Sequence, residues 1–80
     1  MEPYQPISRD VYEVLEEMYL LKQAFNLTFQ QDFLKRTIID ATILDLYTED
    51  GAEYLILEGG VRLRLDQVVA INGKPVQYWV

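Results

Sequence analysis

Residues 8–30 read SRDVYEVLEEMYLLKQAFNLTFQ, and within them the spacing of the apolar residues changes once. In the first half apolar residues recur every three or four positions, as on one face of an α-helix: Val11, Val14, Leu15, Met18, Leu21. Ser8 suits the N-cap of that helix, because its hydroxyl accepts a hydrogen bond from a free N–H of the first turn. In the second half apolar and polar residues alternate, as in a half-buried strand: Phe25, Leu27, Phe29. The stretch therefore predicts one helix over about residues 8–22 and strands over about residues 24–80.

The next apolar run predicts a strand that changes direction. Residues 37–43 are rich in β-branched side chains, and four residues of this run share one face: Thr37, Ile39, Ala41, Ile43. Leu44 and Leu46 then take the opposite phase. We therefore expect a bulge or a sharp bend in mid-strand, of the kind that closes a small barrel.

Turn residues separate the later strands. Residues 49–51 (Glu-Asp-Gly) form one expected turn, and Asn72-Gly73 is a strong signal for a two-residue hairpin. Pro75 has no N–H to donate, so it places the last strand at the edge of a sheet. Apolar and polar residues then alternate over residues 76–80, which predicts a final strand.

The hairpin at Gly59-Gly60 has two possible registers. A two-residue loop pairs Leu57 with Arg62 and puts apolar and cationic side chains on one face. A three-residue loop pairs Leu57 with Val61 and gathers the leucines of both strands inward. We favour the second register because it buries more apolar surface, at about 25 cal/mol per Å².

Composition bounds the class of protein. Eighty residues make one domain, and half of them are hydrophobic, which is enough for a packed core. The chain has no Cys and no His, so it lacks thiolate chemistry and the commonest general base. Seven Lys and Arg against thirteen Asp and Glu give a net charge of -6, which repels a phosphate backbone and attracts a basic protein groove. No apolar run has the length of a membrane span and no signal peptide opens the chain, so we expect a soluble, cytoplasmic protein.

The helix carries most of its charge on one side. Glu13, Glu16 and Glu17 lie opposite the apolar stripe, with Asp10 at the edge of the charged surface. Such a face is either a solvated surface with a favourable dipole at the helix N-terminus or a contact surface for a partner. Catalysis is not expected there, because nothing nearby would shift a carboxyl pKa. The acidic residues around position 50 lack the spacing of a calcium loop, so we expect no metal and no cofactor.

The order of several short motifs resembles the Rho-binding antiterminator family, also called Rof. Members begin Tyr-Gln-Pro-Ile, followed by an acidic helix of the form Asp-x-Tyr-(Asp/Glu)-x-Leu-Glu. Later they carry Asp-Leu, then Glu-Tyr-Leu with a following Glu, and then Leu-Arg-Leu-Asp. The matching residues here are Tyr4-Gln5-Pro6-Ile7, Asp10 to Glu16, Asp45-Leu46, Glu53-Tyr54-Leu55 with Glu58, and Leu63-Arg64-Leu65-Asp66. The chain departs from the family at Val11, in the acidic loop at residues 49–51 and in its short hairpin at Gly59-Gly60.

The resemblance implies a fold, a partner and a site. The implied fold is one Sm-like domain over residues 1–80: mainly β, with an N-terminal α-helix capping a strongly bent, five-stranded antiparallel sheet or small barrel. The implied function is to bind the hexameric RNA helicase Rho, occupy its primary RNA-binding site and so prevent transcription termination. We expect a monomer when free, no direct contact with nucleic acid, and no enzymatic activity. The expected partner-binding residues are Asp10, Tyr12, Glu13, Glu16 and Glu17.

A second class of function is a generic Sm-like module that binds RNA or forms a ring. Arg62 and Arg64 alternate on one strand and are the candidate RNA contacts of such a module. More often such a pair is a solvated strand face beside neighbouring carboxylates. The net charge of -6 favours the first class, because an RNA-binding protein gathers a basic patch.

Overall fold

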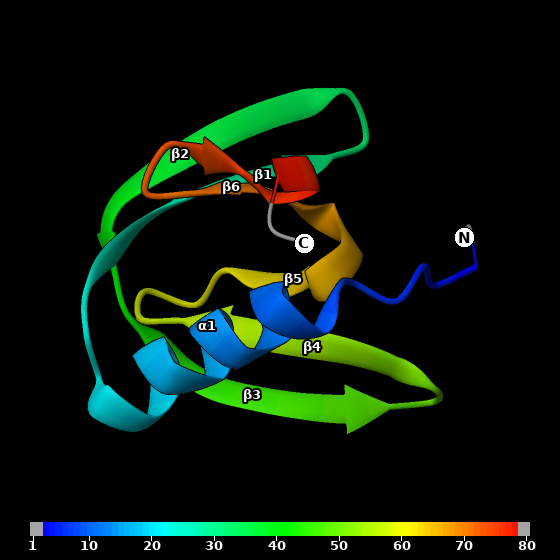
Figure 1. The fold of residues 1–80 in the computed structure, drawn as a ribbon, viewed down its shortest axis with the longest axis horizontal. Helices are drawn as coiled ribbons and strands as arrows, with labels where there is room; N and C mark the ends of the chain where they lie inside the picture. The colour runs from blue at the N-terminus through cyan, green and yellow to red at the C-terminus, as the bar shows by residue number, and fades with distance from the viewer. Residues whose placement is uncertain (1–2, 79–80) are drawn as a thin grey trace.

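The computed structural model describes residues 3–78, which form one N-terminal helix and two antiparallel sheets (Figure 1). Helix α1 spans Arg9–Leu21. The four-stranded sheet has the order β2-β1-β6-β7, with bounds β1 Phe25–Gln31, β2 Leu34–Ala41, β6 Val68–Ile71 and β7 Lys74–Pro75. The three-stranded sheet has the order β3-β4-β5, with bounds β3 Ile43–Glu49, β4 Ala52–Leu57 and β5 Arg62–Arg64. Two short 3-10 helices complete the described chain, η1 Leu65–Gln67 and η2 Val76–Tyr78.

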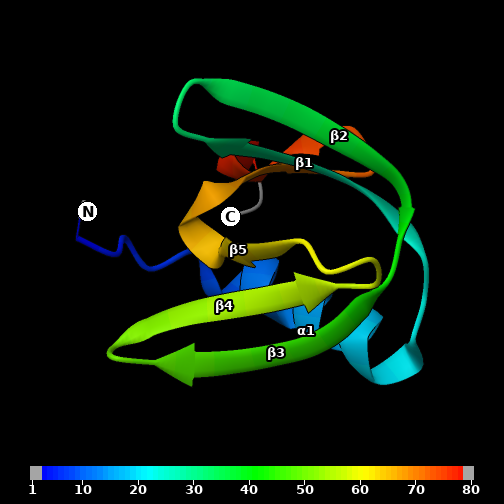
Figure 2. The ribbon, with the colours of Figure 1, turned by 180° about the vertical axis from the view of Figure 1, so that it is seen from behind.

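The prediction of a mainly β fold with one N-terminal helix is confirmed, but the single five-stranded sheet is wrong. The predicted bend lies between β2 and β3, and there it ends one strand and begins another. Figures 1 and 2 show the two strands as one path that turns sharply from the first sheet into the second. Thr42 separates them. The chain therefore builds two sheets of four and three strands around one bend.

A β-bulge beside the bend explains which side chains face inward. Phe25 pairs with Ala41 and Leu27 with Ile38, so two steps along β1 match three steps along β2. The extra residue lies next to Asp40, whose φ of 54° is in the left-handed region. The bulge turns Ile39 outward, where it is 64% exposed, and Ile38 packs against the core instead. The prediction that Thr37, Ile39, Ala41 and Ile43 share one face is thus wrong: Ala41 and Ile43 are buried, whereas Thr37 and Ile39 are exposed.

One core joins the helix to both sheets. Its fully buried large side chains come from α1, from both sheets and from η1: Phe29, Leu15, Leu27, Ile43, Leu55, Leu57, Leu63, Leu65, Ile71, Val11. Of the predicted helix stripe, Val14 and Met18 are half-buried against this core and Leu21 is exposed. The helix ends at once after Leu21, because Lys22 adopts a left-handed conformation and its N–H bonds back to Met18 and Tyr19.

The three glycine-containing hairpins follow their sequence signals. Leu57 N–H donates to the Val61 carbonyl at 2.7 Å, which confirms the three-residue loop between β4 and β5. Asn72 and Gly73 have φ values of 50° and 80° and connect β6 to β7 as a two-residue hairpin. The turn at residues 49–51 joins β3 to β4 through two residues with positive φ, Asp50 and Gly51.

The final strand predicted over residues 76–80 is wrong where the structure describes it. β7 ends at Pro75, and residues 76–78 form η2. Pro75 lies on the edge strand as predicted, and without an N–H it cannot extend the pairing. Val76 packs against the core instead of alternating along a strand. Trp79 and Val80, the end of that predicted strand, lie outside the described residues.

Candidate functional site

Two buried residues fix how α1 is rotated about its own axis. Ser8 caps the helix as predicted, with its hydroxyl accepting from the Val11 N–H at 3.3 Å. Val11 and Leu15, 1% and 0% exposed, fix the rotation of the helix against the core. Because a helical turn is 3.6 residues, this rotation carries the carboxylates to the solvent side.

The structure brings four of the five predicted site residues together on that surface. Asp10, Glu13, Glu16 and Glu17 are all exposed and lie within two turns of one helix. We call these four residues the acidic face. Glu13 pairs with Arg9 at 3.2 Å, but both side chains are largely exposed, so this pair leaves Glu13 accessible. Asp10 lies in the first turn, where its charge is favourable to the helix dipole.

Tyr12, the fifth predicted residue, lies at the border of the acidic face. It is half-buried and packs against the core. Burial, followed by the nearby charges of Glu16 and Glu53, raises its pKa. Tyr12 therefore lies between the core and the carboxylates and is not a freely projecting aromatic residue.

Leu20 lies on the same side of the helix as the carboxylates, and its position is now defined. A leucine on that side either packs under a neighbouring segment or joins the contact surface. Leu20 is 70% exposed, so it does not pack under a neighbour. It adds an apolar residue to the C-terminal end of the acidic face.

A cluster that sequence reasoning missed fastens the segment before the helix. The Tyr4 hydroxyl donates to a Glu53 carboxylate oxygen at 2.6 Å, and the Gln5 N–H donates to Asp66 at 3.0 Å. Asp66 also accepts from Arg64 Nε at 2.7 Å, and these two side chains are only 10% and 13% exposed. The Arg64 guanidinium lies 5.7 Å from the centre of the Tyr4 ring. The matched motifs around Tyr4, Glu53 and Asp66 thus meet in one N-terminal clasp, which positions the start of α1.

The clasp predicts a loss of stability in alkaline solution. Burial, then the hydrogen bond to Glu53 and the charges of Glu53 and Asp66, raise the pKa of Tyr4 above its ordinary value of about 10. The unfolded chain therefore loses this proton at a lower pH than the folded protein does, so the free energy of unfolding falls as pH rises above about 10. Urea unfolding at a series of pH values measures the slope. Tyr4→Phe should reduce it, leaving the part due to Tyr12, and an unchanged slope would contradict the assignment.

The two arginines predicted as a solvated strand face have carboxylate partners. Arg62 pairs with Glu49 at 3.2 Å on the surface, and Arg64 pairs with Asp66 in the clasp. Arg62 also donates to the Tyr47 hydroxyl at 2.6 Å and lies 4.2 Å from the centre of the Tyr54 ring. Tyr47 and Tyr54 stack with 5.6 Å between their ring centres. Both arginines therefore lie beside carboxylates of this chain, as the more common interpretation predicted, but only Arg62 is solvated, because the Arg64 side chain is 13% exposed.

Metal binding and membrane insertion can be examined over residues 3–78. No group of three or more acidic side chains in this range lies close enough to hold a metal ion. Within the same range, no helix combines the length and hydropathy needed to cross a membrane.

In comparisons with known proteins, the chain matches no protein-family model, no curated protein and no solved structure.

Proposed function

We propose that this chain is an inhibitor of transcription termination that binds the Rho helicase and blocks its primary RNA-binding site. The observation that carries the proposal is the acidic face, together with its residue-by-residue match to the Rof helix. Four exposed carboxylates on one rigid helix present negative charge to a partner in a fixed geometry. A groove that binds RNA is basic and lined with aromatic residues, so an acidic helix competes for it by charge and by volume. Such a partner places the protein in the cytoplasm.

The balance of charges supports this proposal over the alternative of an RNA-binding module. An RNA-binding surface needs cations to replace the counterions of the phosphates. The alternative would rely on Arg62 and Arg64, and both are engaged by carboxylates. The net charge of -6 adds a general repulsion.

The direct test of the partner is a pulldown. Immobilised protein is incubated with purified Rho of the source organism, with and without an excess of oligo-C RNA. The proposal predicts that Rho is retained without RNA and that added RNA reduces the amount retained. Failure to retain Rho at micromolar concentrations would remove the proposed function.

A second expected result is that the free protein does not bind RNA. Phosphate contacts need compensating cations, and the chain has a net charge of -6. Fluorescence anisotropy of labelled oligo-C at moderate salt should stay unchanged up to micromolar protein. Saturable binding in that range would favour the Sm-like RNA-binding module instead.

A further inference from the structure

The last turn of α1 exposes two leucines next to the acidic face. Leu20 is 70% exposed and Leu21 is 63% exposed. Residues three and four positions apart are neighbours on one side of a helix, so Leu20 follows Glu16 and Glu17 along the helix axis, and Leu21 follows Glu17. The exposed side of α1 is therefore acidic in its first turns and apolar in its last turn.

This last turn is held in place and is not a fraying helix end. Met18 and Tyr19 pack against the core. The Lys22 N–H donates to the carbonyls of Met18 and Tyr19, and the Gln23 N–H donates to the Met18 carbonyl at 3.0 Å. These bonds satisfy carbonyls that the end of a helix otherwise leaves free. The two leucines are thus presented by a fixed backbone.

The fold does not require a leucine at position 20. Gln and Lys have helix propensities close to that of Leu, and a side chain this exposed adds little to the core. The negative end of the helix dipole explains why the carboxylates stop before the last turn, but it selects only against an anion and does not select an apolar residue. Burying an exposed leucine against a partner is favourable, and adjacent apolar residues bordered by charges are typical of an interaction surface.

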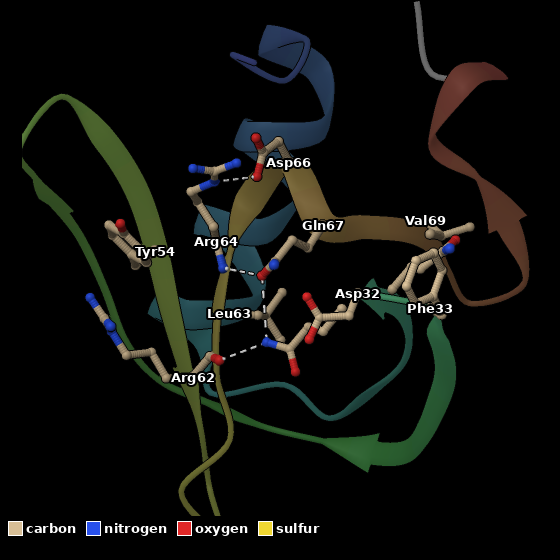
Figure 3. Close-up of a pocket in the computed structure, with 11 residues that line it drawn as sticks. Asp32, Phe33, Tyr54, Arg62, Leu63, Arg64, Asp66, Gln67 and Val69 are labelled. Carbon is tan, nitrogen blue, oxygen red and sulfur yellow. Dashed lines mark hydrogen bonds and ion pairs between the residues drawn. The ribbon is translucent and has the colours of Figure 1, made fainter. Parts of the chain in front are cut away.

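A groove beside β5 is a weaker candidate for a contact surface. It has a volume of about 960 Å³, and no residue of α1 is among those that line it. Figure 3 shows the Arg64 side chain directed at Asp66 and the Arg62 carbonyl bonded to a side-chain amide, so these groups already have partners. Two aspartates and two arginines line the groove, which leaves no excess of charge to select an occupant. Within residues 3–78, by contrast, Glu13 is the one carboxylate of the acidic face that pairs with a cation.

We propose that Leu20 and Leu21 are the apolar part of the surface that enters the RNA-binding groove of Rho, an inference that rests on the proposed function. In a groove that binds single-stranded RNA, cations contact the phosphates and aromatic side chains stack on the bases. The carboxylates of the acidic face take the place of phosphates, and the leucines, one helical turn further along, take the place of a base on an aromatic side chain. Leu20 is the main contact, because it continues the line of Glu16 and Glu17.

A second copy of this chain is a poorer occupant of the leucine pair. Two copies that met through Leu20 and Leu21 would bring their acidic faces close to each other. Each chain has a net charge of -6, so this approach is repulsive. A basic groove has the opposite charge and removes that cost.

The test measures the affinity of the fluorescently labelled full chain for Rho by anisotropy at a series of salt concentrations. Leu20→Gln should weaken binding by about tenfold or more at every salt concentration, because burying a leucine side chain contributes about that factor. The slope of log Kd against log salt concentration should not change, because no charge is altered. Glu17→Gln should instead lower that slope, because it removes a charge from the interface.

Two control variants separate this contact from a general effect of the substitution. Leu34 lies in β2 and is 56% exposed, so Leu34→Gln makes the same chemical change outside α1 and should leave the affinity unchanged. Leu20→Met keeps an apolar side chain of similar size and should bind as the original chain does. Unfolding curves of Leu20→Gln and the original chain in urea should coincide.

Several results would overturn the inference. Unchanged affinity in Leu20→Gln, or an equal loss in Leu34→Gln, would do so while leaving Rho binding in place. A large loss of stability in Leu20→Gln would show that the leucine serves the fold. Self-association of the free chain that Leu20→Gln abolishes would assign the leucines to a second copy. Absence of Rho binding by the original chain would remove the proposed function as well.

Discussion

Reversing two charges, Glu13→Lys with Glu16→Lys, should abolish Rho binding while leaving the fold intact. Both side chains are exposed, and the one ion pair lost, Arg9 with Glu13, is largely solvated. Its loss and the new repulsion from Arg9 should change the free energy of unfolding by less than about 1 kcal/mol. Truncating a desolvated interface charge costs about 2–5 kcal/mol, so reversal should weaken binding by at least about 30-fold. Pulldown and termination assays, with unfolding curves alongside, measure both effects.

The matched control changes the same charge elsewhere. Asp45→Lys with Glu58→Lys also shifts the net charge from -6 to -2, because each reversal removes one negative charge and adds one positive charge. Both residues are exposed and lie outside α1. This control should retain most of the Rho binding. Equal loss in both variants would mean that overall charge, and not the acidic face, determines binding, and full inhibition by the helix variant would place the interface on the sheets.

Removing one partner of the most buried ion pair should destabilise the domain more than any surface change. Asp66→Ala leaves the Arg64 guanidinium, 13% exposed, without its 2.7 Å carboxylate contact and takes the acceptor from the Gln5 N–H. Breaking such a pair costs about 3–5 kcal/mol. A domain of this length has a total stability of about 4–12 kcal/mol, so a large fraction should unfold under mild denaturant. Urea titration followed by circular dichroism measures the loss.

The Arg62–Glu49 pair provides the comparison. It also joins an arginine to a carboxylate, at 3.2 Å, but its side chains are 50% and 55% exposed. Glu49→Ala should therefore cost less than about 1 kcal/mol. Similar losses in Asp66→Ala and Glu49→Ala would show that burial in the clasp does not set the strength of the pair.

The helix and the hairpins were predictable because their signals are local. The cap at Ser8, the apolar spacing from Val11 to Met18 and the Asn72-Gly73 turn each depend on residues a few positions apart. The acidic face follows from the same spacing, since burying Val11 and Leu15 exposes the opposite side. The sequence could not reveal that Asp40 adopts a left-handed conformation, and that single residue decides whether Ile38 or Ile39 faces the core.

The clasp was missed because it joins distant parts of the chain. Tyr4 and Glu53 are forty-nine residues apart, and Gln5 and Asp66 are sixty-one. No periodicity records such contacts. Tyr4, Glu53 and Asp66 all fall in motifs that resemble those of the Rof family. The motifs alone do not show that these three side chains belong to one cluster.

A competition experiment shows whether this chain and RNA occupy the same site on Rho. Fluorescein-labelled oligo-C is bound to the primary RNA site of Rho, and this chain is titrated in while anisotropy is recorded and complexes are separated by native gel electrophoresis. If the chain and RNA occupy the same site, the chain should displace the RNA completely, the apparent Kd for RNA should rise in proportion to the concentration of the chain, and no species should contain all three components. A stable complex of Rho, RNA and this chain would show that the chain binds elsewhere on Rho.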